Sequence, residues 1–91
     1  MGARRSKFRI VADIMEVIAR EGEVNVSKLL LEANLSYARL SKYLEELTER
    51  GLVERVEGYR EVRYRLTKKG ESLLRELERI RVIAEAFGIE L

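Results

Sequence analysis

The sequence has 91 residues, 46% hydrophobic and 37% charged, with a formal net charge of +2 and neither cysteine nor histidine. This balance favours one folded domain over a disordered chain, and no apolar run approaches the roughly 20 residues that span a bilayer. Without cysteine and histidine there are no disulfides, thiolate chemistry, zinc sites or imidazole catalysis. We therefore expect no enzyme activity, metal or cofactor. The basic N-terminus lacks the apolar segment of a secretion signal, so we expect a cytoplasmic protein.

The positive charge is concentrated in two parts of the chain. Residues 1–9 carry four cations and no anion, and residues 51–70 carry six cations against three anions. An uneven distribution of this kind is typical of nucleic-acid binding. Asp13 is the only aspartate, asparagine occurs twice and glutamine is absent. A glutamate-, lysine- and arginine-rich composition with few amides indicates a thermophilic source.

The first predicted helix follows a basic arm and ends near Arg20, before Gly22. Its apolar residues recur at helical spacing: Phe8, Val11, Ile14, Met15 and Ile18. The arm is either a solvated terminus or a set of phosphate contacts. Residues 23–26 alternate polar and apolar and predict a very short strand.

A helix-turn-helix is predicted next. Ser27 is expected to cap the first of its two helices, which buries Leu29, Leu30 and Ala33. Asn34 and Leu35 form the turn, because asparagine tolerates left-handed backbone.

The second helix of this pair, residues 36–50, is the main candidate for function. Ser36 is its expected N-cap, Gly51 its stop, and Leu40, Leu44 and Leu47 form its buried stripe. Its other faces carry small, polar and basic residues in the first two turns. That layout suits a helix in a DNA major groove, and equally an ordinary solvated helix.

Alternating apolar residues on either side of Gly58 predict a β-hairpin, with its tip at residues 57–60 and a positive φ at Gly58. Arg60 at the tip is a predicted phosphate contact. Arg63 and Arg65 on the polar face of the second strand could either pair with Glu54 and Glu57 or contact DNA, and the sequence leaves both open.

Thr67 is expected to cap a last helix, whose first turn holds Lys68 and Lys69. Cations there oppose the helix dipole, so a phosphate or solvent must compensate. An apolar seam spaced four, three, four, three follows, and predicts a coiled coil with a second subunit. The expected dimer residues are Leu73, Leu77, Ile80, Ile83, Ala84 and Phe87. The alternative is that this helix folds back on its own domain.

The order helix, short strand, helix, turn, helix, hairpin, helix is that of a winged helix-turn-helix. The segments EANLSYARLSKYLEELTERGLVE and YRLTKKGESLL resemble the small archaeal winged-helix DNA-binding proteins of about ten kilodaltons. The resemblance covers about residues 7–80 and implies a dimer joined by a C-terminal antiparallel coiled coil. It also implies a mainly helical α+β fold, with a DNA-binding domain at residues 1–70 and a dimerisation helix at residues 71–91.

We therefore expect a homodimeric, double-stranded DNA-binding protein with a regulatory or chromatin role. The residues expected to reach base edges are Tyr37, Ala38, Arg39, Ser41 and Lys42. The expected contacts to the DNA backbone are Arg4, Arg5, Lys7, Tyr59, Arg60, Lys68 and Lys69. The alternative is a winged-helix module that binds protein rather than DNA.

Overall fold

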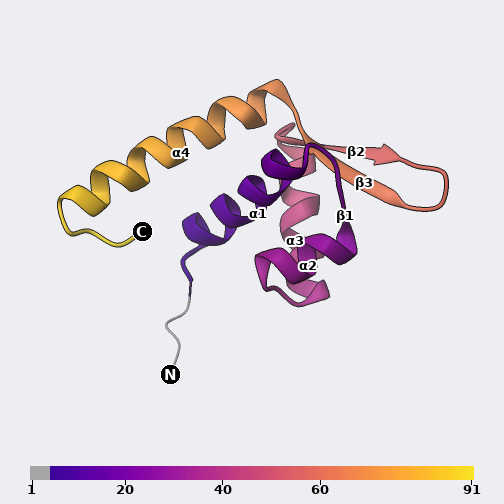
Figure 1. The fold of residues 1–91 in the computed structure, drawn as a ribbon, viewed down its shortest axis with the longest axis horizontal. Helices are drawn as coiled ribbons and strands as arrows, with labels where there is room; N and C mark the ends of the chain where they lie inside the picture. Colours follow the sequence, from indigo (N-terminus) through magenta and orange to yellow (C-terminus); the bar gives the residue numbers. More distant parts are fainter. Residues whose placement is uncertain (1–4) are drawn as a thin grey trace.

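The computed structural model describes residues 5–91, which form four helices and a small three-stranded sheet (Figure 1). In chain order the elements are α1 (Lys7–Glu21), β1 (Val24–Asn25), α2 (Val26–Ala33), α3 (Tyr37–Glu49), β2 (Val53–Glu57), β3 (Val62–Leu66) and α4 (Lys68–Ala86). The sheet is antiparallel, with the strand order β1-β3-β2. The mainly helical α+β prediction is confirmed. Arg4, one of the predicted DNA contacts, lies outside the described residues.

The core forms around α1, whose apolar residues repeat at helical spacing. Ile10, Ile14, Met15 and Ile18 are each at most 2% exposed. Burial of each such side chain stabilises the fold by about 1.5–3 kcal/mol. The predicted α3 stripe belongs to the same buried cluster through Leu40, Leu44 and Leu47.

The helix caps confirm two of three predictions. The Ser36 hydroxyl accepts a hydrogen bond from the backbone N–H of Arg39, and the Thr67 hydroxyl accepts one from Gly70. The prediction for Ser27 is wrong. The N-cap lies two residues earlier, at Asn25, whose side chain accepts a hydrogen bond from the backbone N–H of Lys28 at 2.9 Å. Asparagine is at least as good an N-cap as serine, so the last residue of β1 can also start α2.

The turn between α2 and α3 is built as predicted. Asn34 ends α2 with a φ of 54° and a ψ of 57°, in the left-handed region that asparagine tolerates. The turn places α3 across α2, where the N-terminus of α3 remains at the surface (Figure 1).

The β2–β3 hairpin forms the wing, but its tip differs from the prediction. Gly58 does not have a positive φ. Its N–H donates to the carbonyl of Glu61 at 2.9 Å, and a Cβ at position 58 would lie 2.6 Å from that oxygen. Glycine is required here because the backbone approaches closely, and not because of left-handed geometry.

The start of α4 is fixed against the turn between α3 and β2. The Thr67 hydroxyl donates to the carbonyl of Gly51 at 2.7 Å, and the Lys69 ammonium donates to the carbonyl of Arg50 at 3.0 Å. Gly70 is buried so close to Leu52 that a Cβ would lie 2.0 Å from its carbonyl oxygen. These contacts fix the direction in which α4 runs from the end of β3.

From there α4 runs beside α1 (Figure 1). Its first turns pack on the core through Leu73, Leu74 and Leu77. Ala84 is 9% exposed, while Ile80, Ile83 and Phe87 are 48%, 54% and 78% exposed. The predicted six-residue seam therefore divides. Three of its members pack within the chain, as the fold-back alternative requires, and three remain exposed.

Candidate nucleic-acid interface

The first two turns of α3 present a small, polar and basic surface. The leucine stripe points into the core, so Tyr37, Ala38, Arg39 and Lys42 are exposed and Ser41 is half-buried. The five residues that we predicted to reach base edges therefore lie together outside the core. Neither Arg39 nor Lys42 forms an ion pair with any residue in the range 5–91. Both cations are thus available to an external anion.

Beside this surface lies a hollow of about 370 Å³ between α3 and the start of α1. It is lined by Lys7, Arg39, Lys42, Tyr43 and Glu46. The Lys7 ammonium donates to Oε1 of Glu46 at 2.7 Å. This hydrogen bond is the largest of the effects that hold the pKa of Glu46 below its usual value. The hollow therefore contains three cations and one firmly ionised carboxylate.

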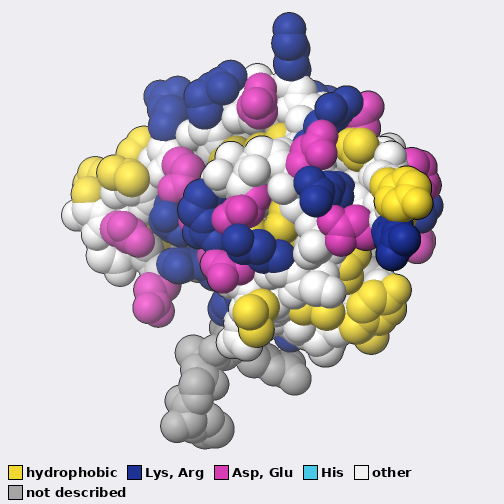
Figure 2. Space-filling model, turned by 45° about the vertical axis from the view of Figure 1, so that its right-hand side comes forward, with side chains coloured by type: hydrophobic (Ala, Val, Ile, Leu, Met, Phe, Trp, Pro, Cys, Tyr) yellow, Lys and Arg dark blue, Asp and Glu magenta, His cyan; other side chains and the backbone are white. Residues whose placement is uncertain are grey.

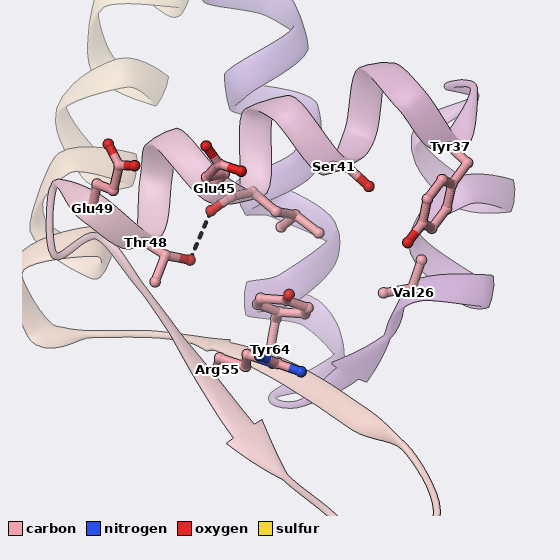
Figure 3. Close-up of a pocket in the computed structure, with 9 residues that line it drawn as sticks. Val26, Tyr37, Ser41, Glu45, Thr48, Glu49, Arg55 and Tyr64 are labelled. Carbon is pink, nitrogen blue, oxygen red and sulfur yellow. Dashed lines mark hydrogen bonds between the residues drawn. The ribbon is translucent and has the colours of Figure 1, made fainter.

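The second half of α3 has the opposite character. Its exposed side chains include Glu45 and Glu49, which border a groove of about 360 Å³ between α3 and the wing. Figure 3 shows Tyr37 facing the groove from the N-terminal end of α3, and Tyr64 and Arg55 facing it from the strands. Carboxylates repel the DNA backbone, so this side of α3 disfavours a phosphate near Glu45 and Glu49.

The arginines of the wing strands are held by carboxylates. Arg65 lies 2.9 Å from Glu54, and Arg63 lies 2.8 Å from Glu61. The pairing alternative is thus correct for Arg65, whereas Arg63 pairs with a neighbour on its own side of the hairpin instead of with Glu57. On the face drawn in Figure 2, basic and acidic side chains are interspersed.

The tip of the wing differs from its strands. Tyr59 is 93% exposed, and the Arg60 guanidinium lies 5.2 Å from the centre of its ring. Among residues 5–91, Arg60 has no carboxylate partner. A cation–π contact leaves the charge of the guanidinium uncompensated, so the tip can still bind a phosphate.

Other predicted backbone contacts have different environments. Arg5 donates to Asp13 at 2.9 Å and to the carbonyls of Ala33 and Asn34 at 2.7 Å each, which ties the N-terminal arm to the end of α2. Lys69 is bound to the C-terminal end of α3, where the helix dipole favours a cation. Lys68 is exposed. DNA contact by any of the three stays a prediction.

Glu46 is the residue of this surface that sequence reasoning missed. It pairs with Lys7 across 39 positions of the chain. No local pattern signals such a pair, because i,i+3 and i,i+4 spacing describes only contacts within one helix.

Comparison with known protein families gives the same fold as the order of the helices and strands. A family model described as winged helix-turn-helix matches residues 4–85. The chain belongs to this family. No helix within residues 5–91 is long and apolar enough to cross a membrane.

The chain is also similar to three known proteins. Sso10a-2, a DNA-binding protein from Sulfolobus solfataricus, has 24% sequence identity and a TM-score of 0.81, over 91% of this chain and 85% of that one. An uncharacterized protein of Methanocaldococcus jannaschii, MJ0287, is 28% identical over 81% of this chain and 71% of its own length. Streptococcus pneumoniae FabT, solved in complex with DNA, has 26% identity and a TM-score of 0.71, over 94% of this chain and 64% of FabT.

Proposed function

We propose that this chain is a double-stranded DNA-binding protein with a role in transcription regulation or chromatin. The observation that carries the proposal is the exposed N-terminal half of α3, where Arg39 and Lys42 have no carboxylate partner within residues 5–91. Membership of the winged helix-turn-helix family supports it. The fold likeness to Sso10a-2, itself a DNA-binding protein, supports it further.

In this proposal α3 enters the major groove by its first two turns. Arg39 or Lys42 donates to the acceptor edge of guanine, and Ala38 contacts a thymine methyl group. Arg60 at the tip of the wing binds a backbone phosphate. Glu45 and Glu49, on the side of α3 toward the wing, then lie away from the backbone phosphates, which they would repel.

The test is a titration of a random duplex and an A·T-rich duplex with the protein. Fluorescence anisotropy measures binding at each of a series of salt concentrations. Neutralising about four to six phosphates per subunit gives a log–log slope near −0.9 for each contact. A steep slope with little difference between the duplexes indicates a chromatin-type protein, and a strong preference indicates a site-specific regulator. Absence of binding at low salt contradicts the proposal and favours a protein-interaction module.

We also propose that the chain forms a homodimer through the exposed apolar stripe of α4. Ile80, Ile83 and Phe87 are spaced three and four residues apart and thus share one side of the helix. A two-fold dimer would place two copies of α3 about 34 Å apart, or a multiple of that distance.

Sedimentation velocity tests the dimer. Ile83→Lys is expected to shift the protein to monomer at micromolar concentration, because it places a charge in the apolar contact. Val82→Lys is the matched control. Val82 is 63% exposed and projects about 100° away around the helix, so this variant should stay dimeric. Equal dissociation of both variants, or a monomeric wild type, contradicts this interface.

A further inference from the structure

We propose that Glu46 occupies, in the free protein, the position that a backbone phosphate of the duplex takes in the complex, and so weakens DNA binding. The proposal rests on the proposed function, and it adds a residue that limits affinity. In it the carboxylate is a built-in competitor for the cations of α1 and α3.

The position of Glu46 is the first argument. Its Oε1 lies 2.7 Å from the ammonium of Lys7, in the hollow that Arg39 and Lys42 also line. Arg39 and Lys42 belong to the half of α3 that faces the duplex in the proposed complex. A carboxylate oxygen and a phosphate oxygen accept the same charge-assisted hydrogen bonds. Lys7 can therefore exchange one acceptor for the other without moving far.

The local charge is the second argument. Three cations line the hollow beside one carboxylate, and Nε of Arg50 lies 3.9 Å from Oε1 of Glu46, so the surroundings keep a net positive charge even with Glu46 ionised. Lys7 begins α1 and Arg39 lies in the first turn of α3, and neither helix has an acidic residue in its first turn. Both helix N-termini thus add positive potential that no acid of their own offsets. An incoming anion is attracted, but it also meets the charge of Glu46.

Removal of that charge should strengthen DNA binding. Glu46→Gln keeps the length of the side chain but removes the negative charge that competes with a phosphate. We therefore expect binding of a random duplex to tighten about three- to ten-fold at roughly 0.1 M salt. Glu76→Gln is the matched control. Glu76 is an exposed carboxylate paired with Arg79 on α4, and its loss makes the same change in net charge. It should alter affinity less than about two-fold, because charges beyond about 10 Å are screened at this salt concentration.

A second pair of variants tests the exchange itself. Lys7→Ala should weaken binding more in the Glu46→Gln background than in the wild type, because only there is the ammonium free before DNA arrives. Thermal unfolding of each variant checks that the fold is intact, since an exposed ion pair contributes little to stability.

Two results together overturn the proposal in a protein whose wild type binds DNA. Glu46→Gln and Glu76→Gln change the affinity equally, and Lys7→Ala weakens binding by the same factor in the wild type and in the Glu46→Gln background. Those results leave the proposed function standing, whereas a wild type that binds no duplex removes the proposed function itself. Inorganic phosphate, compared with chloride at matched ionic strength, separates a duplex phosphate from a free one. We expect no saturable rise in the unfolding temperature, and a saturable rise would assign the hollow to a small anion.

Discussion

Two clusters of mixed charge lie at different places along α1, and their compositions are opposite. The α3 cluster, Lys7, Arg39, Lys42 and Glu46, has three cations and one carboxylate and lies beside the exposed turns of α3. The α4 cluster, Glu16, Glu78 and Arg81, has two carboxylates and one cation and lies between α1 and α4. The first has positive charge left over, and the second has negative charge left over.

The α4 cluster favours binding of a proton, because Arg81 is the one cation within residues 5–91 that pairs with its two carboxylates. Arg81 lies 3.2 Å from Glu16 and 2.9 Å from Glu78. Oε2 of Glu16 and Oε1 of Glu78 are nevertheless buried without a hydrogen bond. Burial, followed by the close carboxyl group of Glu78 and its charge, raises the pKa of Glu16 to about 7, and Asp13 adds a smaller effect in the same direction. A proton between the two carboxyls would satisfy both oxygens.

We infer that the sign of the uncompensated charge decides which ligand each cluster favours. On α3 the surplus is positive and accessible, so the expected ligand is a phosphate. Between α1 and α4 the surplus is negative and partly enclosed, so the expected ligand is a proton. The two clusters should therefore respond to different variables, the first to salt and the second to pH.

The largest expected effect is on the α3 cluster. Arg39→Ala combined with Lys42→Ala should weaken binding of a random duplex about 10- to 100-fold and reduce the salt slope by about 2, since two phosphate or base contacts are lost. Fluorescence anisotropy over a salt series measures both quantities.

The control for this double variant removes two cations from elsewhere on the surface. Arg75→Ala combined with Arg79→Ala changes the net charge equally, but these exposed arginines lie on α4. Affinity should then fall only slightly. A loss as large as that of the α3 variant would mean that DNA responds to net charge, and not to the position of α3.

The next effect concerns the pH response of the α4 cluster. The pKa of Glu16 is about 7 in the folded protein against an ordinary 4.5, so the folded state holds this proton more tightly than the unfolded chain. The contribution of Glu16 to stability is therefore fully present below pH 4.5 and is lost as the pH rises through 7. The Glu16 and Glu78 side chains are each 35% exposed, and after allowance for solvent screening we expect a loss of about 1 kcal/mol.

Urea unfolding at pH 5 and pH 8 measures this loss. Glu16→Gln should remove most of the difference between the two pH values, since the amide cannot ionise. Glu76→Gln, which alters an exposed pair on the same helix, should leave the difference unchanged. The assignment fails if the wild type is equally stable at both pH values.

Local patterns predicted most of the fold, and contacts between distant residues account for what they did not predict. Ser36, Thr67 and Asn34 act within a few residues of themselves, so their roles could be predicted from the chain alone. The close approach at Gly58 depends on the path of the hairpin, and the same glycine would serve a left-handed turn equally well. Sequence spacing correctly indicated an apolar stripe on α4.

The candidate site shows the same limit. The α3 residues could be predicted because one amphipathic helix defines which of its side chains are exposed. The charge available at the surface could not, since Lys7 and Glu46 are paired across 39 positions and the sequence left open whether Arg65 pairs with Glu54. Counting cations in residues 51–70 overestimated the basic character of the wing, because the count ignores which cations form ion pairs with carboxylates in the folded protein.

The smallest expected effect is therefore on the strands of the wing. Arg63→Ala combined with Arg65→Ala should weaken DNA binding less than about three-fold, because both guanidinium groups already have carboxylate partners at 2.8 and 2.9 Å. Arg60→Ala, which removes one unpaired cation at the tip, should cost more than the strand pair, and anisotropy on one duplex compares the two directly. If the strand variant loses as much as the Arg39 and Lys42 variant, the arginines must exchange their glutamates for phosphates on binding. The wing would then use the same exchange that we propose for Lys7 and Glu46, and paired cations would count fully toward the interface.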